Sequence, residues 1–133
     1  MEKRKKLLIV DDDPIQLSLA ESILKAEYDV VATASGKEAL DHLYHSFIPD
    51  LILLDILMPE MGGFEVYKRI RAISLLQNIP IAFLTSVSGS NEMKQALDIG
   101  AADYIMKPYT KESLLRRIRD VLQNSQYSKT MDV

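Results

Sequence analysis

Acidic, hydroxyl and ammonium side chains follow several short apolar runs, where they could share one chemical task. Three consecutive acids, Asp11 to Asp13, follow the first run, and Asp55 follows a second. Thr85 follows a third run, and Lys107 follows a fourth. Carboxylates a few ångströms apart repel one another unless a cation neutralises them, and Mg²⁺ prefers such oxygen ligands. With two or three carboxylates, Mg²⁺ retains waters and readily shares a phosphate, so the pattern predicts a magnesium site suited to phosphate chemistry.

The same residues could stabilise a phosphoryl group during transfer. A metal ion, the Lys107 ammonium and the Thr85 hydroxyl would surround an acid, and Asp55 would then be the nucleophile. Lys107 could equally serve as a structural counter-ion, and the sequence leaves both roles open. A single aspartate after a strand is usually just solvated, so the prediction depends on the whole set.

Two alternating apolar periods predict the elements that bring these residues together. Short continuous runs predict strands buried on both faces, at residues 7–10, 30–32, 51–54, 81–84 and 104–106. Stretches with helical spacing follow them, around residues 15–23, 39–47, 66–73, 93–97 and 114–122. Strict alternation predicts a doubly wound α/β sandwich, (βα)5, with a five-stranded parallel sheet. The carboxyl ends of its strands, where the polar residues lie, meet at one edge.

Composition narrows the function classes. At 133 residues, with 47% hydrophobic and 26% charged residues, the chain has the composition of one folded domain. The absence of cysteine excludes disulfides, thiolate metal sites and cysteine catalysis. The net charge of −3 argues against direct nucleic-acid binding, and no apolar run approaches the ~20 residues of a membrane span. We expect a soluble, cytoplasmic domain at residues 1–124 and a polar tail or truncated linker at residues 125–133.

Five separated motifs resemble those of the receiver domain of two-component response regulators. They are Leu8-Ile9-Val10-Asp11-Asp12, Leu54-Asp55-Ile56-Leu57-Met58-Pro59, Leu84-Thr85-Ser86, Gly100-Ala101-Ala102-Asp103-Tyr104 and Met106-Lys107-Pro108-Tyr109. The resemblance extends over about residues 6–123. It implies the flavodoxin-like strand order 2-1-3-4-5. It also implies that the domain accepts a phosphoryl group from a sensor histidine kinase or a histidine phosphotransfer protein.

The resemblance implies a role for each acid. Asp55 would accept the phosphoryl group, and Asp12 would bind Mg²⁺, or Mn²⁺ in its place, directly. Asp11 would act through water, while Asp55 and the backbone carbonyl of Leu57 would complete the protein ligands. The domain would catalyse only its own phosphorylation and dephosphorylation, so we do not expect an enzyme with a separate substrate. The apolar Leu57 side chain would lie near the path of the attacking water.

The resemblance also implies a switch. Lys107 and Thr85 would contact phosphoryl oxygens, with the peptide bond before Pro108 in the cis form. Tyr104 would then turn inward into space vacated by Thr85, although a tyrosine that merely packs at the rim is the alternative. The output face would comprise the fourth helix, the fifth strand and the fifth helix, at residues 91–124. This face could form a homodimer, or it could be a solvated surface. Its charged candidates for intersubunit ion pairs are Lys94, Asp98, Asp103, Arg116, Arg117 and Arg119.

The three consecutive acids leave their register open. Asp13 precedes Pro14, so we assign it to the N-cap of the first helix. If Asp12 and Asp13 formed the metal-binding pair instead, the first strand would extend one residue beyond Val10. Gly62 stands where an acid is usual in the family, so the third helix is expected to lack a side-chain cap.

Three other classes of protein compete with a phosphoacceptor domain. A phosphate-independent, receiver-like interaction module would lack acids or the lysine, and here all are present. A haloacid-dehalogenase-type phosphatase also begins with a strand and an acidic pair, but it carries Thr or Val where this chain has Ile15, and we expect no room for its cap domain. No glycine-rich phosphate-binding loop follows the first strand, which disfavours a nucleotide-binding enzyme.

Overall fold

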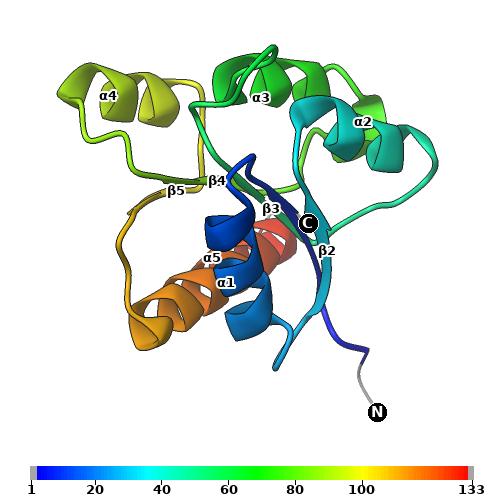
Figure 1. Cartoon of the computed structure of the whole chain (residues 1–133). Helices are drawn as coiled ribbons and strands as arrows, with labels where there is room; N and C mark the ends of the chain where they lie inside the picture. Colours follow the sequence, from blue (N-terminus) through cyan, green and yellow to red (C-terminus); the bar gives the residue numbers. More distant parts are fainter. Residues whose placement is uncertain (1–2, 132–133) are drawn as a thin grey trace.

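The computed structural model describes residues 3–131, and the side chains of residues 3–124. A sheet of five parallel strands runs in the order β2-β1-β3-β4-β5. The strands are β1 (Lys6–Val10), β2 (Asp29–Thr33), β3 (Leu51–Leu54), β4 (Ile81–Thr85) and β5 (Asp103–Met106). The helices are α1 (Pro14–Leu24), α2 (Gly36–Tyr44), α3 (Gly63–Arg71), α4 (Ser90–Asp98) and α5 (Lys111–Met131). Helices α2, α3 and α4 cover one face, and α1 and α5 cover the other, which confirms the doubly wound sandwich and its strand order (Figure 1).

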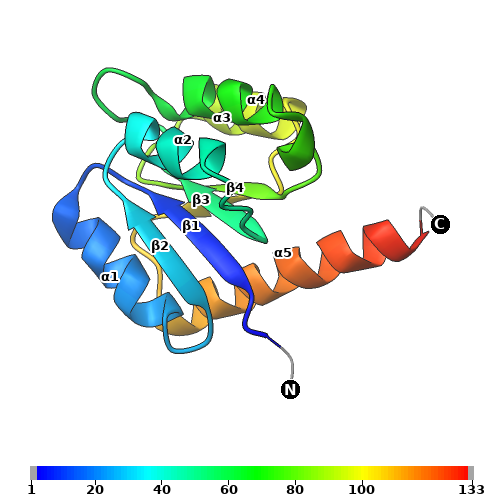
Figure 2. The ribbon, with the colours of Figure 1, turned by 90° about the vertical axis from the view of Figure 1, so that its right-hand side faces the viewer.

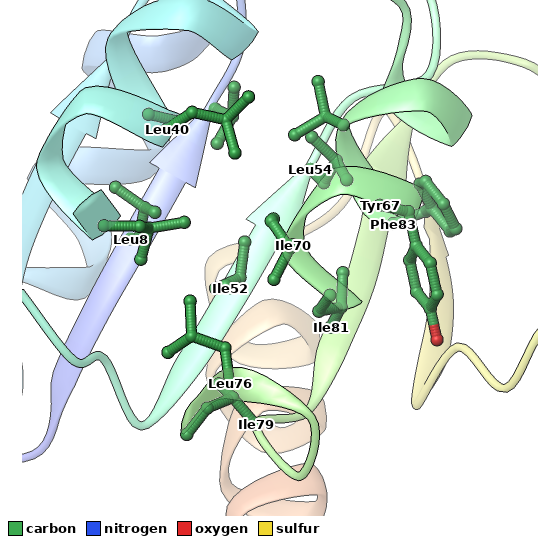
Figure 3. Packing of buried hydrophobic residues seen from close by; sticks show 14 of the residues in the cluster. Leu8, Leu40, Ile52, Leu54, Tyr67, Ile70, Leu76, Ile79, Ile81 and Phe83 are labelled. Atoms are coloured by element: carbon green, nitrogen blue, oxygen red, sulfur yellow. The ribbon is translucent and has the colours of Figure 1, made fainter. Parts of the chain in front are cut away.

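The sheet separates two apolar cores, which explains why its strands are continuously apolar. Successive residues of a strand point to opposite faces. Leu8 and Ile52, which pair across β1 and β3, belong to the core beneath α2 and α3 (Figure 3). Their neighbours Leu7 and Leu53 belong to the core beneath α1 and α5. Because both faces of the sheet are covered, apolar residues are needed at consecutive positions.

Local chemistry fixes several helix ends. The Asp13 carboxylate accepts hydrogen bonds from the backbone amides of Ile15 and Gln16, so the predicted N-cap of α1 is confirmed. Helix α3 begins after Gly62 without a side-chain cap, as predicted. Gly100 follows α4 with φ of +98°, a left-handed conformation that glycine adopts without strain.

Two helices end earlier than their apolar spacing predicted. Helix α2 ends at Tyr44, and Ser46 then turns with φ of +74°. Helix α3 ends at Arg71, and a short 3₁₀ helix, η1 (Ser74–Leu76), follows. Phe47 and Ile73 still pack against the core, but they do so from loops. Apolar periodicity indicates which residues pack into the core. Because loop residues can also pack into the core, the periodicity overestimated the length of these helices.

Helix α5 continues to Met131 and projects beyond the sheet (Figure 2). We predicted a polar tail from residue 125, whereas the backbone of residues 125–131 is helical. No glycine or proline interrupts this stretch, so the backbone can extend the helix without apolar residues. The division into a domain at 1–124 and a linker stays a prediction. None of the described helices combines the length and apolarity needed to cross a bilayer.

Candidate functional site

The carboxyl edge of the sheet brings the predicted acids together. Val10 and Leu54 pair in the parallel register of β1 and β3, so the acids that follow them emerge side by side. One carboxylate oxygen from each of Asp11, Asp12 and Asp55 lies within 4.8 Å of the other two. Asp11 and Asp55 are buried, whereas Asp12 is exposed. This donor set of carboxylate oxygens fits a hard divalent cation such as Mg²⁺.

The acidic pair that gathers with Asp55 is therefore Asp11 and Asp12, and not the alternative register that used Asp13. Strand β1 ends at Val10, and Asp13 caps α1. The backbone amide of Asp13 also donates to Asp11 Oδ1 at 3.0 Å, which holds the first acid against the start of the helix. Asp13 thus orders the loop between β1 and α1 and lies outside the group of three gathered carboxylates.

Lys107 enters this acidic pocket from the end of β5. Its Nζ donates to Asp11 Oδ2 at 2.5 Å and lies 3.6 Å from Asp55 Oδ2. The Lys107–Pro108 peptide bond is cis, as the resemblance implied. In this structure the ammonium is mainly the counter-ion of Asp11. It also lies beside Asp55, so the counter-ion role and the phosphoryl-contact role left open by the sequence are compatible.

Burial affects the titration of Asp11, one carboxyl of the pocket. It raises the pKa of the Asp11 carboxyl above its ordinary value, although hydrogen bonds from Lys107 and from the backbone of Asp13 oppose that shift. A buried carboxylate therefore stays costly to ionise beside only one ammonium. A divalent cation would favour the charged form of Asp11.

Backbone geometry places Asp55 at the end of β3. Its carboxylate accepts a hydrogen bond from the amide of Ile56 at 2.7 Å. Gly63 closes the following loop by donating to the carbonyl of Ile56, and a Cβ at position 63 would lie 2.2 Å from the carbonyl oxygen of Asp55. Only glycine fits that approach. The side chain of Leu57 is 68% exposed beside this loop.

Thr85 ends β4 at the same edge of the sheet as the acids, and Tyr104 lies on the neighbouring strand β5. Thr85 is buried, and its hydroxyl accepts from the amide of Val87 at 3.2 Å. Tyr104 is 5% exposed, and its hydroxyl donates to the carbonyl of Val87 at 2.6 Å. Burial, followed by the charges of Glu92 and Asp55, raises the pKa of Tyr104. The Tyr104 side chain is thus already buried in this structure, and its inward turn on phosphorylation, with rim packing as the alternative, stays a prediction.

Tyr109 is a residue of the site that sequence reasoning passed over. Its hydroxyl is buried and finds no hydrogen-bond partner among the described side chains and backbone. Burial raises its pKa, and the negative charge of Asp11 adds to that shift. The signal was available, since Tyr109 directly follows the Lys107-Pro108 motif, but the electrostatic effect of Asp11 on its hydroxyl depends on the fold, which spacing cannot reveal.

The candidate dimer charges are partly engaged within the chain. Arg117 Nε lies 3.5 Å from Asp103 Oδ2, and Arg119 Nη1 lies 3.8 Å from Glu27 Oε1. An intersubunit pair that used these groups would have to replace or share these bonds.

The strand order and the acidic pocket define the class, a flavodoxin-like fold of the CheY type. A family model for the response regulator receiver domain matches residues 7–119, and the chain belongs to this family. It is therefore a receiver domain of two-component signalling.

Relatives and solved structures agree with this assignment. The chain is 38% identical to the response regulator MprA of Mycolicibacterium vanbaalenii, over 90% of this chain and 51% of that protein. It is 40% identical to a probable cyclic di-GMP phosphodiesterase of Vibrio cholerae, over 89% of this chain and 26% of that protein. The structure of chemotaxis protein CheY4 from Vibrio cholerae matches with a TM-score of 0.83 and 32% identity, covering 90% of this chain and 99% of that one. The chain thus spans about half or less of the length of these curated relatives.

Proposed function

We propose that Asp55 accepts a phosphoryl group while Asp11, Asp12, Asp55 and the backbone carbonyl of Leu57 hold Mg²⁺, or Mn²⁺ in its place. One observation carries the proposal. Three carboxylates converge within 4.8 Å at the end of the central strands, and a lysine ammonium lies 3.6 Å from one of them. A pocket with this charge distribution suits an incoming group that is itself an oxyanion.

Each side chain has a distinct task in the transfer. A carboxylate oxygen of Asp55 attacks phosphorus, and the bond to the donor breaks with its electron pair leaving on the donor. Lys107 is close enough to turn from Asp11 toward the new phosphoryl oxygens. Thr85 supplies a hydroxyl donor from β4. When bound, Mg²⁺ would offset the negative charge gathered on the acids and the phosphoryl oxygens.

The donor in this proposal is a sensor histidine kinase or a histidine phosphotransfer protein. Exposed apolar side chains beside the pocket support a protein donor. Ile15 is 77% exposed at the start of α1, Leu19 is exposed one turn further, and Leu57 is exposed next to Asp55. Apolar residues grouped around a reactive group are typical of a docking surface.

The output in this proposal is a change on the face formed by α4, β5 and α5, reached through Thr85 and Tyr104. This face would regulate a partner or an output domain, or pair with a second copy of the chain. We place the domain in the cytoplasm and propose that it binds no nucleic acid directly. A receiver-like module that never meets phosphate remains the competing function.

Phosphate uptake from acetyl phosphate with Mg²⁺ tests the proposal, with intact-mass spectrometry as the measurement. We expect the wild type to gain one phosphoryl group and Asp55→Asn to gain none. Asp13→Asn is the matched control, because asparagine preserves the N-cap and the substitution removes the same charge. It should label like the wild type.

Each other outcome has a clear meaning. Equal labelling of wild type and Asp55→Asn would contradict the acceptor assignment. Loss of labelling in Asp11→Asn with retention in Asp55→Asn would favour the phosphatase alternative. A folded wild type that never labels, even with Mg²⁺ present, would favour the interaction module.

A further inference from the structure

A groove between α3 and α4 lies outside the acidic pocket. It has a volume of about 560 Å³, within the range of small-molecule sites. Its lining comprises Phe64, Glu65, Tyr67, Lys68 and Arg71 of α3, Gln95 of α4, and Ile99, which directly follows α4. Gln95 and Ile99 are one helical turn apart, so they share a flank of α4, whereas Met93 and Leu97 lie on a different flank.

The groove carries positive charge that the chain does not neutralise. Glu65, the one acid in the lining, is bonded to Arg69 at 2.9 Å. Among the side chains described, residues 3–124, no carboxylate lies within salt-bridge distance of Lys68 or Arg71. Arg71 instead donates to the carbonyl of Leu76 at 2.8 Å. Two cations therefore face this groove without an acidic partner.

The groove also offers apolar and aromatic surface. The Arg71 guanidinium carbon lies over the Tyr67 ring, 5.0 Å from its centre, so the cation contacts an aromatic face. Phe64 is partly buried in the groove wall, and Ile99 is an exposed apolar residue on the opposite side. A bare inorganic ion would leave this apolar surface uncovered, and a neutral apolar compound would leave the two cations unpaired.

We propose that this groove binds a small organic anion with an apolar body about the size of a ring system. The apolar body would rest against Phe64 and Ile99. The anionic group would lie between Lys68 and Arg71, where it completes the charge balance of the lining. This site is separate from the carboxylates that would bind Mg²⁺ and from the output face on the other flank of α4.

Aromatic contacts connect this groove to Tyr104. The Phe64 and Tyr67 rings lie 5.2 and 5.9 Å from the ring of Phe83, and the Phe83 ring lies 6.2 Å from that of Tyr104. Tyr67 and Phe83 lie side by side in the core (Figure 3). The Tyr67 hydroxyl also donates to the carbonyl of Ile99, which ties α3 to the end of α4. A bound anion that moves Phe64 or Tyr67 therefore changes the packing around Tyr104.

A pair of matched probes tests the ligand class. 1-Anilinonaphthalene-8-sulfonate is an aromatic sulfonate, and N-phenyl-1-naphthylamine is the same ring system without the sulfonate. We expect the folded wild type to bind the sulfonate in a saturable, one-to-one manner by fluorescence titration, and to bind the neutral compound at least about ten-fold more weakly. Equal affinity for both compounds, or no saturable binding of the sulfonate, would overturn the proposal.

Variants locate the site. Lys68→Gln should weaken sulfonate binding about ten-fold, because it removes one charge-assisted hydrogen bond. Lys94→Gln removes the same charge from the outer side of α4 and should bind like the wild type. Amide signals of Gln95 and Ile99 should shift on titration in ¹⁵N NMR. Equal weakening by both variants, or shifts confined to other surfaces, would overturn the site.

The connection to Tyr104 has its own readout. Its ring signals, assigned with Tyr104→Phe, should shift as the sulfonate saturates the groove. Unchanged ring signals would overturn the connection. All of these titrations omit a phosphoryl donor, and Asp55→Asn should bind the sulfonate like the wild type. Failure of the groove proposal is thereby distinguishable from failure of phosphoryl transfer.

Discussion

Helices α4 and α5 both flank β5 in the chain, yet they are attached to the fold very differently. Helix α4 has nine residues, all of them described, and Ala96 alone is buried. Its N-cap residue, Gly89, provides no side-chain cap. Helix α5 buries a full apolar stripe of Leu114, Leu115, Ile118, Val121 and Leu122. Thr110 and Ser113 bond reciprocally to each other's backbone amides at its start.

This difference suits α5 to stabilising the fold and α4 to moving when the domain changes state. Segments with few buried apolar contacts unfold locally at a low cost in free energy. The parts of proteins that move in function are usually such segments. One flank of helix α4 lines the proposed anion-binding groove, and another belongs to the proposed output face. The Tyr104 hydroxyl bonds to the loop that precedes this helix. Helix α5 anchors the opposite face of the sheet. A small change near Asp55 can therefore displace α4 while α5 holds the fold.

The largest difference between α5 and α4 should come from replacing one apolar residue of each helix with alanine. Ile118→Ala removes a fully buried side chain of α5 and should lower the free energy of unfolding by about 3 kcal/mol. Leu97→Ala, at a site on α4 that is 61% exposed, should change it by less than about 0.5 kcal/mol. Urea denaturation measures both. Similar losses from the two substitutions would remove the contrast.

Hydrogen exchange should show the same contrast without a mutation. We expect the central amides of α5 to exchange on the order of 100-fold more slowly than those of α4, because opening α4 uncovers little apolar surface. NMR-detected exchange of the wild type gives both rates in one experiment. Equal protection would mean that α4 opens only with the whole fold.

The helix caps should differ by a smaller amount. Thr110→Ala removes the hydroxyl that caps α5 and should destabilise the protein by about 1 kcal/mol. Thr110→Ser keeps the hydroxyl and serves as the control, with little expected change in thermal unfolding. A serine variant as unstable as the alanine variant would show that the methyl group, and not the cap, is responsible.

The smallest effect is expected where a cap is added. Gly89→Ser should stabilise α4 by a few tenths of a kcal/mol, because φ of −66° and ψ of 136° at this position suit an N-cap residue. The new Cβ meets the end of the flexible Glu92 side chain, which must move aside. Exchange of α4 amides is the measurement, and exchange of α5 amides is the internal control. Faster exchange in α4 would contradict the expected cap.

Sequence reasoning predicted the sheet well, for a physical reason. Runs such as Leu51–Leu54 are buried on both faces, so their composition alone distinguishes them from half-exposed strands. It also predicted which edge gathers Asp11 and Asp55, because polar residues that end neighbouring parallel strands must meet. The geometric grouping of these acids follows from strand register, while their chemical roles stay predictions.

Features that depend on side-chain placement were not predictable. The preference of Lys107 for Asp11 over Asp55 depends on distances of 2.5 and 3.6 Å, which spacing along the chain does not encode. Phe47 reaches the core from a loop, which its helical spacing concealed. The groove depends on the distance and angle between α3 and α4. The residue pattern of each helix does not predict how it is placed relative to the other.

The bond between Lys107 and Asp11 joins positions 96 residues apart in the chain. During translation, Asp11, Asp12 and Asp55 leave the ribosome long before the lysine does. We expect a nascent chain that lacks β5 to hold an uncompensated acidic edge, unsuited to a phosphoryl donor. Competence for phosphoryl transfer would thus arise only when synthesis of the fold is nearly finished.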